Sequence, residues 1–264
     1  MRITSAPPDA CHATAAIYRD FWPRTVAPHI VAANRERASF HVGLVLSLVP
    51  KRDHERPTVV DLGGGFGDVL CALARLGYAG VLVDDFADVG AQDHQDLRNR
   101  MAVACGLTRI AADVVSEPLP FAPGSIDAFL TFESMEHWHH SPKALFARVI
   151  AQLKPGGLFV IGVPNCVNLR KRLSVPLGYG KWTSMKDWYE PAVFRSHVRE
   201  PDTDDLRYIA RDMGLSDVRV FGRNWIGYRK ANPLFRTALR VCDRALRLAP
   251  GLCGDIYLIG RKPG

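Results

Sequence analysis

The sequence predicts an α/β domain whose core is a doubly wound, mostly parallel sheet. Short apolar runs alternate with helix-like patterns between residues 57 and 163, which is the order of successive βαβ units. A glycine-rich turn joins the first apolar run to a helix, as at the ligand-binding edge of such sheets. A chain of 264 residues can bury one sizeable core, so we expect a single domain over 1–264.

The elements of this domain are predicted in the following order. Two helices lie between residues 10 and 49, interrupted near Pro23 and Pro28, and a polar connector follows at 51–57. Short apolar runs predict strands at 58–62, 80–84, 109–112, 126–132 and 157–163. Apolar residues at helical spacing predict helices at 68–76, 92–104 and 142–153. Pro155-Gly156-Gly157 indicates a helix stop before the last of these strands.

Residues 164–203 interrupt the alternation and predict a loop-rich insert. The insert contains several prolines and glycines and a group of aromatic residues, namely Tyr179, Trp182, Trp188, Tyr189 and Phe194. A long irregular segment inside a compact domain is usually functional. Its aromatic rings are expected either to pack against one another or to stack on the faces of sugar rings.

The C-terminal part returns to regular structure. Thr203 is predicted to cap a helix that runs to about Met213 and ends at Gly214, and strands are expected at 217–222 and 256–260. A basic amphipathic helix is predicted at 233–248. Its apolar stripe is formed by Phe235, Leu239, Cys242 and Leu246, and its basic stripe by Arg236, Arg240, Arg244 and Arg247. We expect the apolar stripe to pack on the domain; contact with an anionic membrane surface is the alternative.

The spacing of the glycines after the first strand indicates the kind of ligand. A dinucleotide site needs G-x-G-x-x-G, but here the glycines are Gly63, Gly65 and Gly67, and Asp68 takes the third place. A carboxylate at that helix start would repel a pyrophosphate, whereas Asp61 at the strand end suits a positively charged ligand. S-adenosylmethionine (SAM) carries a sulfonium and an ammonium group and no phosphate, so SAM is favoured over NAD.

A pair of acids lies where a ribose would need them. The apolar run at 80–83 ends in Asp84 and Asp85, about 20 residues beyond the glycine turn. An ionised carboxylate can accept one hydrogen bond from each ribose hydroxyl. The second strand therefore predicts a nucleoside contact beside the glycine turn.

These two stretches, D-x-G-x-G-x-G from Asp61 to Gly67 and the strand that ends in Asp84, resemble the class I SAM-dependent methyltransferases. The resemblance implies SAM as the cofactor, S-adenosylhomocysteine as the product, and a seven-stranded sheet whose last strand is antiparallel. It also implies that a helical segment at 1–56 lies over the cofactor and acceptor cleft. The SAM-binding core is then 57–163, the acceptor-side insert 164–203 and the C-terminal part 204–264.

The same resemblance assigns roles to residues after the third and fourth core strands. Asp113 is expected to contact the adenine amino group and Val114 to pack on the ring; the alternative for Asp113 is a turn aspartate. The sequence Glu133-Ser134-Met135-Glu136-His137 resembles the family's E-x-L-E-H ending, which reaches the point where cofactor and acceptor meet. Glu133 is therefore expected at the cofactor and His137 as a candidate general base, with His139 and His140 less favoured. The alternative for His137 is a structural histidine.

A second candidate base lies at the end of the insert. His197-Val198-Arg199-Glu200 resembles a subset of bacterial methyltransferases associated with polysaccharides, which places His197 near the acceptor. The alternative is a loop tied down by Arg199 and Glu200. We expect O-methylation of a saccharide or sugar-containing acceptor with a histidine base. A small aromatic acceptor such as a quinone or polyketide, and a non-catalytic SAM-binding protein, are the alternatives.

Composition limits the partners. The formal net charge of +7 favours an acidic partner, but the N-P-P-[YF] tetrad of amino-group methylation is missing, so nucleic acid is not favoured. The six cysteines show no metal-ligand spacing, which predicts free thiols in a cytoplasmic protein and no metal site; magnesium is left open. The first residues lack the order of a signal peptide, and the apolar run at 42–49 is too short to cross a bilayer.

Overall fold

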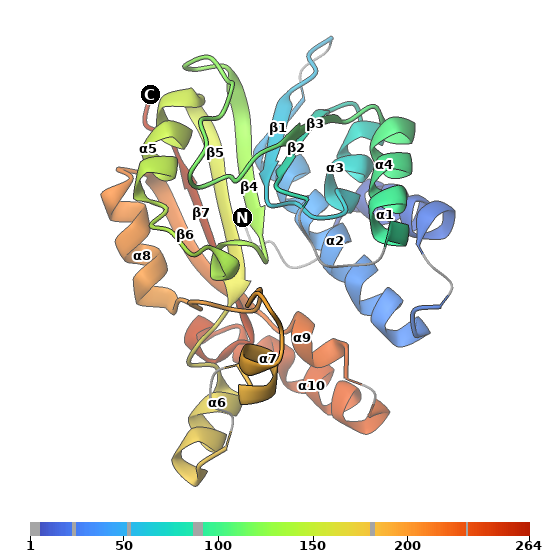
Figure 1. The fold of residues 1–264 in the computed structure, drawn as a ribbon, viewed down its shortest axis with the longest axis vertical. Coiled ribbons are helices and arrows are strands. Elements are labelled where there is room, and N and C mark those ends of the chain that lie inside the picture. Colours follow the sequence, from blue (N-terminus) through green and yellow to red (C-terminus); the bar gives the residue numbers. More distant parts are fainter. Residues whose placement is uncertain (1–5, 23–24, 52–53, 87–91, 180–182, 231) are drawn as a thin grey trace.

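The computed structural model describes residues 6–22, 25–51, 54–86, 92–179, 183–230 and 232–264. Its centre is one seven-stranded sheet with the order β3-β2-β1-β4-β5-β7-β6 (Figure 1). The strands are β1 Thr58–Leu62, β2 Ala79–Asp84, β3 Thr108–Ala111, β4 Ile126–Phe132, β5 Leu153–Pro164, β6 Ser216–Arg223 and β7 Asp255–Arg261. Strands β1 to β5 pair in parallel, and β7 is antiparallel to both β5 and β6. The predicted doubly wound sheet with an antiparallel last strand is confirmed.

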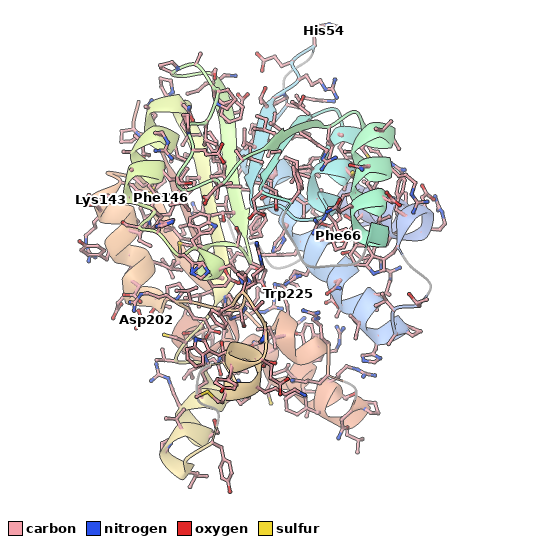
Figure 2. All side chains as sticks on the ribbon, viewed as in Figure 1. His54, Phe66, Lys143, Phe146, Asp202 and Trp225 are labelled. Carbon is pink, nitrogen blue, oxygen red and sulfur yellow. The ribbon has the colours of Figure 1, made fainter. Side chains whose placement is uncertain are left out.

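Helices cover both faces of the sheet because its central strands are apolar on both faces. One face packs against α1 (Pro8–Phe21), α2 (Pro28–Leu48), α3 (Asp68–Arg75), α4 (Gln92–Cys105) and α9 (Trp225–Tyr228). The other packs against α5 (Lys143–Gln152) and α8 (Thr203–Asp212). Alternate side chains of β1 serve the two cores: Val59 faces the first and Val60 the second. In Figure 2, Phe146 marks the side of the sheet that packs against α5, and Trp225 the side that packs against α9.

Two predicted boundaries are wrong, each for a local reason. Helix α8 is capped by Asp202 and not by Thr203, because the Asp202 carboxylate accepts hydrogen bonds from the N–H groups of Asp204 and Asp205 at 2.8 and 2.9 Å. Strand β5 begins at Leu153, so Pro155-Gly156-Gly157 lies within it. This segment is irregular, with Gly156 at a φ of 74°, but it stays in the sheet because Gly156 N–H donates to the Lys262 carbonyl and Lys262 N–H to the Gly157 carbonyl.

The insert contains short helices that the sequence did not predict. These are α6 (Leu169–Ser174) and α7 (Met185–Tyr189), with one-turn helices at Val175–Leu177 and, outside the insert, at Met135–His137 and Pro250–Leu252. Each of α6 and α7 begins at a polar cap, since Asn168 accepts from Lys171 N–H and Ser184 from Asp187 N–H. Both helices lie at one end of the molecule, beyond the end of β5 (Figure 1).

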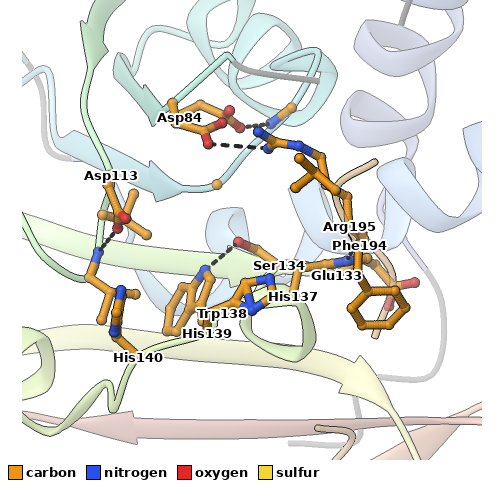
Figure 3. A pocket seen from close by; sticks show the side chains of 16 residues that line it. Asp84, Asp113, Glu133, Ser134, His137, Trp138, His139, His140, Phe194 and Arg195 are labelled. Carbon is orange, nitrogen blue, oxygen red and sulfur yellow. Dashed lines mark hydrogen bonds and ion pairs between the residues drawn. The ribbon is translucent and has the colours of Figure 1, made fainter. Parts of the chain in front are cut away.

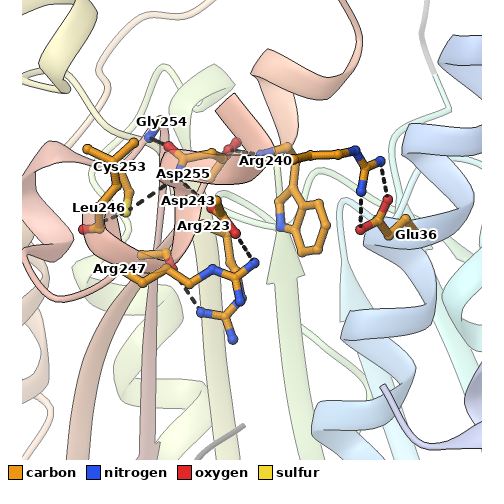
Figure 4. Close-up of polar contacts among 12 residues, drawn as sticks. Glu36, Arg223, Arg240, Asp243, Leu246, Arg247, Cys253, Gly254 and Asp255 are labelled. Carbon is orange, nitrogen blue, oxygen red and sulfur yellow. Dashed lines mark hydrogen bonds and ion pairs between the residues drawn. The ribbon is translucent and has the colours of Figure 1, made fainter. Parts of the chain in front are cut away.

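Helix α10 (Pro233–Leu246) packs differently from the prediction. Leu239 and Leu246 are half-buried, but Phe235 and Cys242 are exposed, so only half of the predicted apolar stripe meets the domain. Polar contacts hold the helix instead (Figure 4): Arg240 donates to both oxygens of Glu36 on α2, at 3.3 and 2.8 Å. Asp243 is the buried residue of α10, and it accepts a hydrogen bond from Asn224 Nδ2 at 2.8 Å.

Two further sequence predictions concern the whole chain. All six cysteines carry free thiols, as predicted. None of the helices in the described part of the chain combines the length and the apolar character that crossing a membrane requires.

Candidate active site

A cavity of about 590 Å³ lies at the carboxyl ends of β1 to β4 (Figure 3). Open α/β sheets bind ligands at this edge, where the strand order reverses, and the volume is within the range of small-molecule sites. Seven of the nine residues predicted to bind the cofactor line it: Gly63, Gly65, Asp84, Asp85, Asp113, Val114 and Glu133. His137 lines it too, together with His139 and His140.

The glycine turn forms one wall of the cavity. Gly63, Gly65 and Gly67 all have positive φ angles, of 71°, 55° and 75°, which L side chains rarely adopt. A Cβ on Gly63 would lie 1.9 Å from the Ser134 hydroxyl oxygen, whereas a Cβ on Gly65 would meet none of the described atoms within 4 Å. Gly63 is therefore needed for packing inside the protein, and Gly65 borders open space where a ligand can approach the backbone.

The acids after β2 lie beside this turn. Asp84 accepts hydrogen bonds from Gly65 N–H at 3.0 Å and from Phe86 N–H at 2.9 Å. Burial raises the pKa of Asp84, although these two hydrogen bonds and the charge of Arg98 oppose the shift. Each carboxylate oxygen keeps a further acceptor position for a ligand. The neighbouring Asp85 forms an ion pair with Arg195 at 3.6 Å.

Asp113 forms the turn contacts of its structural alternative and also lines the cavity. Its Oδ1 accepts hydrogen bonds from Val115 N–H at 2.9 Å and Ser116 N–H at 3.2 Å, so it organises the turn after β3. Burial on its own would raise the pKa of Asp113, but these backbone hydrogen bonds hold that pKa below its ordinary value. Asp113 and the buried Val114 also line the cavity, where an adenine ring is expected.

Two histidines from distant parts of the chain meet at the edge of the cavity. His137 ends the short helix after β4 and His197 belongs to the insert, yet their ring centroids lie 4.8 Å apart in an edge-to-face arrangement. Nδ1 of His137 lies 3.0 Å from the Arg195 carbonyl oxygen, and Nδ1 of His197 lies 2.6 Å from Oε1 of Glu200. Burial and the charge of His197 lower the pKa of His137.

Comparison with known proteins identifies the family. Residues 32–220, well over half of the chain, match the family described as a methyltransferase domain. The chain belongs to this methyltransferase family. The protein is accordingly a SAM-dependent methyltransferase, and SAM is its cofactor. The glycine turn, which lacks the third glycine of a dinucleotide site, and the open space beside Gly65 fit such a ligand.

Solved structures share the fold of this methyltransferase. A SAM-dependent methyltransferase of Thermotoga maritima, named as a possible histamine N-methyltransferase, is 14% identical with a TM-score of 0.56; the alignment covers 96% of this chain and 99% of that one. A SAM-dependent methyltransferase of Archaeoglobus fulgidus is 15% identical with a TM-score of 0.54; the alignment covers 89% of this chain and 100% of that one. Phosphoethanolamine N-methyltransferase 2 of Haemonchus contortus, in complex with phosphomonomethylethanolamine and S-adenosylhomocysteine, is 16% identical with a TM-score of 0.54. The alignment covers 94% of this chain and 60% of that one. No curated protein matches the methyltransferase by sequence.

Two residues predicted to bind the cofactor do not line this cavity of the methyltransferase. Gly67 caps the start of α3, and Asp61 lines a separate pocket of about 60 Å³ together with Tyr18, Arg37 and Asp68. Burial, followed by the charges of Asp68 and Asp84, raises the pKa of Asp61 well above its ordinary value. The predicted cofactor contact of Asp61 stays a prediction. Gly64 packs against the Asp61 carboxylate, because a Cβ on Gly64 would lie 2.6 Å from Asp61 Oδ2.

Glu133 links the N-terminal helices to the cavity. Its φ of 53° is unusual for a residue with a side chain, and strain of this kind concentrates at functional sites. Oε2 of Glu133 accepts a hydrogen bond from Arg37 of α2 at 2.8 Å. None of the described residues of α1 and α2 lines this cavity, but Tyr18 of α1 and Arg37 of α2 line the small pocket beside Asp61.

The insert also lines the cavity, through a cover segment made of Val193, Phe194 and Arg195. Arg195 was not predicted, because the path of the insert over the sheet is not visible in local sequence. The other aromatic residues described in the insert are largely exposed and do not line the cavity; these are Tyr179, Trp188 and Tyr189. Trp182 lies outside the described residues.

The loop that carries His197 is fixed by ion pairs. Arg199 pairs with Asp205 at 3.1 Å, as the local alternative anticipated, and Glu200 contacts both His197 and Lys171. Burial acts against the charge of Glu200, but its hydrogen bonds with His197 and Lys171 lower its pKa to about 2. Glu200 is therefore an anion that holds the His197 ring in place.

Glu136 belongs to the sequence Glu133–His137, which predicted no role for it. It is 1% exposed, and within the described part of the chain neither of its carboxylate oxygens has a hydrogen-bond partner. Burial, followed by the charge of Glu133, raises its pKa well above the ordinary value. Its position directly before the candidate base His137 was the signal in the sequence that could have marked it.

Proposed function

We propose that this methyltransferase O-methylates a hydroxyl group of a saccharide or sugar-containing acceptor, with His137 or His197 as the general base. One observation carries the histidine part of the proposal. Each histidine has its Nδ1 beside a protein acceptor, the Arg195 carbonyl for His137 and the Glu200 carboxylate for His197. An Nδ1–H donated to these acceptors leaves Nε2 as the nitrogen that can take a proton.

The other residues are proposed to bind and orient. Asp84 is proposed to accept hydrogen bonds from the ribose hydroxyls, Asp113 and Val114 to bind the adenine, and Gly65 to allow close backbone approach. Glu133, Asp85 and Gly63 complete the walls of this cofactor site. SAM supplies a methyl group that its sulfonium has already activated, so the protein needs to add little covalent chemistry.

Orientation is expected to contribute more than the base. Holding the acceptor oxygen in line with the methyl group supplies roughly 7–11 kcal/mol. A positioned histidine adds about 10²–10⁴-fold in rate. The cover segment supports both roles, because Phe194 and Arg195 close over the cavity while the Arg195 carbonyl holds the His137 ring.

A small aromatic acceptor, such as a quinone or a polyketide, is the second candidate. It would use every cofactor contact described above, and a phenol loses its proton more readily than a sugar hydroxyl. Dependence on the base therefore separates the two candidates. A non-catalytic SAM-binding protein, the third alternative, would have no need of a base held in one orientation beside the cofactor.

Methyl transfer from SAM labelled in its methyl group tests the proposed acceptor. The purified chain is incubated with cell extract divided into saccharide, lipid, protein and RNA fractions. We expect label in the saccharide fraction, or in a lipid fraction from which glycan-cleaving enzymes release it. Label that stays in small aromatic compounds would favour the second candidate, and label in protein or RNA would contradict both.

We also propose that helix α10 contacts an anionic membrane surface where a lipid-linked acceptor would be presented. Leu234, Val241 and Leu248, on and just after this helix, are 80%, 76% and 87% exposed, and Arg244 lies between them. Cosedimentation should occur with vesicles of phosphatidylglycerol and phosphatidylcholine, and not with phosphatidylcholine alone. Equal binding to both vesicles, or to neither, would contradict this contact. The free thiols support a reducing compartment such as the cytoplasm.

A further inference from the structure

Three residues with metal-ligating side chains converge beside the cavity. Glu136 and His137 are adjacent after β4, and His197 comes from the insert. Each offers one donor atom, and the three donor atoms lie within 4.8 Å of one another. We propose that Glu136, His137 and His197 bind a divalent transition-metal ion at the acceptor end of the cavity.

The hydrogen bonds of the two histidines match those of metal ligands. A ligating histidine usually donates its other ring N–H to a carbonyl or a carboxylate, which fixes the orientation of the ring. His137 has the Arg195 carbonyl 3.0 Å from its Nδ1, and His197 has Glu200 2.6 Å from its Nδ1. Glu200 is held in turn by Lys171. Both rings are thus oriented in advance, with Nε2 as the ligating nitrogen.

The carboxylate of Glu136 is the independent observation that points to a cation. Both of its oxygens are buried without a hydrogen-bond donor among the described residues. A buried carboxylate is stable as an anion only beside a positive charge or a set of donors.

The backbone already joins the two segments that carry the ligands. The Glu136 carbonyl accepts hydrogen bonds from Val198 N–H at 2.7 Å and from Arg199 N–H at 3.2 Å. These bonds hold the His197 loop against the end of β4. The donor atoms of a tetrahedral site lie roughly 3.3 Å apart, so the side chains need only small rotations to close from 4.8 Å.

The ligand set indicates the class of metal. Two imidazoles and one carboxylate are typical of zinc, iron, cobalt and manganese, whereas magnesium prefers oxygen ligands. Three protein ligands leave at least one coordination position for another molecule. Because His137 lines the cavity, this position is expected to face the acceptor.

The role that we assign to the ion rests on the proposed O-methylation and replaces the histidine base in it. The acceptor hydroxyl oxygen would bind the ion and release its proton to water, because a metal ion lowers the pKa of a bound hydroxyl. The oxygen lone pair then forms the bond to the methyl carbon, while the electrons of the broken C–S bond remain on sulfur. With the ion bound, His137 and His197 act as ligands, and the ion takes over the activation that a free histidine base would provide.

Metal titration of the full chain tests the site without measuring activity. Protein freed of metal by a chelator is titrated with Co²⁺, followed by visible absorption, and with Zn²⁺, followed by calorimetry. We expect one equivalent to bind. Glu136→Gln and His197→Ala, which alter ligands on different segments, should each weaken binding by about tenfold or more. His140→Ala, which removes a cavity histidine outside the three ligands, should bind the metal as the parent does.

Two results would overturn the inference. One is the absence of stoichiometric binding by the parent; the other is unchanged affinity in both ligand variants, which indicates surface binding only. Circular dichroism checks that each variant is folded, and the second ligand variant decides if one does not fold. A parallel titration with S-adenosylhomocysteine keeps the two proposals apart. Protein that binds S-adenosylhomocysteine but no metal contradicts the metal site alone, whereas protein that does not bind S-adenosylhomocysteine contradicts the proposed function.

Discussion

The carbonyl oxygen of Arg195 lies 3.0 Å from Nδ1 of His137, which joins the insert to the end of β4. The guanidinium of the same residue reaches Asp85, after β2, at 3.6 Å. A single residue of the cover segment therefore touches the predicted ribose side of the cavity and its acceptor side (Figure 3). Changes at either histidine can consequently be separated from changes at the cofactor only by measuring binding and turnover together.

The histidines give the first prediction. Whichever of His137→Ala and His197→Ala removes the general base should lower turnover by about 10²-fold or more, and both should do so if the two histidines hold a metal ion. The dissociation constant of S-adenosylhomocysteine should stay within about threefold of the parent value, which is less than 1 kcal/mol. His12→Ala, on an exposed part of α1, is the control. If both variants keep more than about a tenth of the parent turnover, no histidine activates the acceptor.

The second prediction concerns Asp84. Asp84→Asn should weaken S-adenosylhomocysteine binding by about tenfold or more, because the ribose hydroxyls lose a charged acceptor worth about 1.5–3 kcal/mol per hydrogen bond before water compensates. The amide oxygen can still accept from one of the two backbone N–H groups, of Gly65 or Phe86, so we expect the fold to persist with a smaller loss of stability. Calorimetric titration measures the effect, with Asp85→Asn as the matched neighbour. A loss confined to Asp85→Asn would move the ribose contact to that residue.

The third prediction concerns Gly65. Gly65→Ala should abolish or strongly weaken cofactor binding, because the new methyl group enters the open space that the ligand is expected to occupy. Gly106→Ala is the matched control, since Gly106 has a φ of 62°, is likewise free of described neighbours within 4 Å, and does not line the cavity. Both variants should lose about 1–2 kcal/mol of stability from the strained backbone. Equal cofactor affinity in the two would show that the turn is structural only.

The fourth prediction uses pH. Burial raises the pKa of Asp61, so the folded protein holds this proton more tightly than the unfolded chain does. The parent therefore loses stability as the pH rises above the unfolded pKa, and the loss is complete above the folded pKa. Asp61→Asn cannot ionise. Without cofactor, its melting temperature should exceed that of the parent at about pH 8, and the difference should shrink towards about pH 4. A pH-independent difference would mean that Asp61 carries no charge penalty.

Much of the sheet could be predicted because the relevant signals are local. The bounds of β1 and β4 agree with the prediction, since each is a short apolar run between turn residues. The residues that follow the strands gather at one edge for the same reason: parallel strands present their carboxyl ends together. This argument brings Asp84, Asp113 and Glu133 to one cavity without any knowledge of their contacts.

The remaining features depend on contacts between distant segments. Helical spacing predicted an apolar contact for α10. The helix is positioned also by hydrogen bonds, from Asn224 to Asp243 and from Arg240 to Glu36. Asn224 and Glu36 lie outside α10, so the pattern of this helix could not indicate them. The burial of Glu136 and the meeting of the two histidines likewise depend on the path of the insert. No periodicity within the insert specifies that path.

The position of β7 has a consequence for synthesis. β7 (Asp255–Arg261) lies between β5 and β6, although it follows both in the chain. The edges of β5 and β6 that face β7 therefore have no partner until β7 has been made. Until then both strands expose unpaired edges, which are prone to association with other chains. A nascent chain on the ribosome would thus carry a nearly finished SAM-binding half beside an open edge. Full closure of the sheet has to wait for the last of its seven strands to emerge from the exit tunnel.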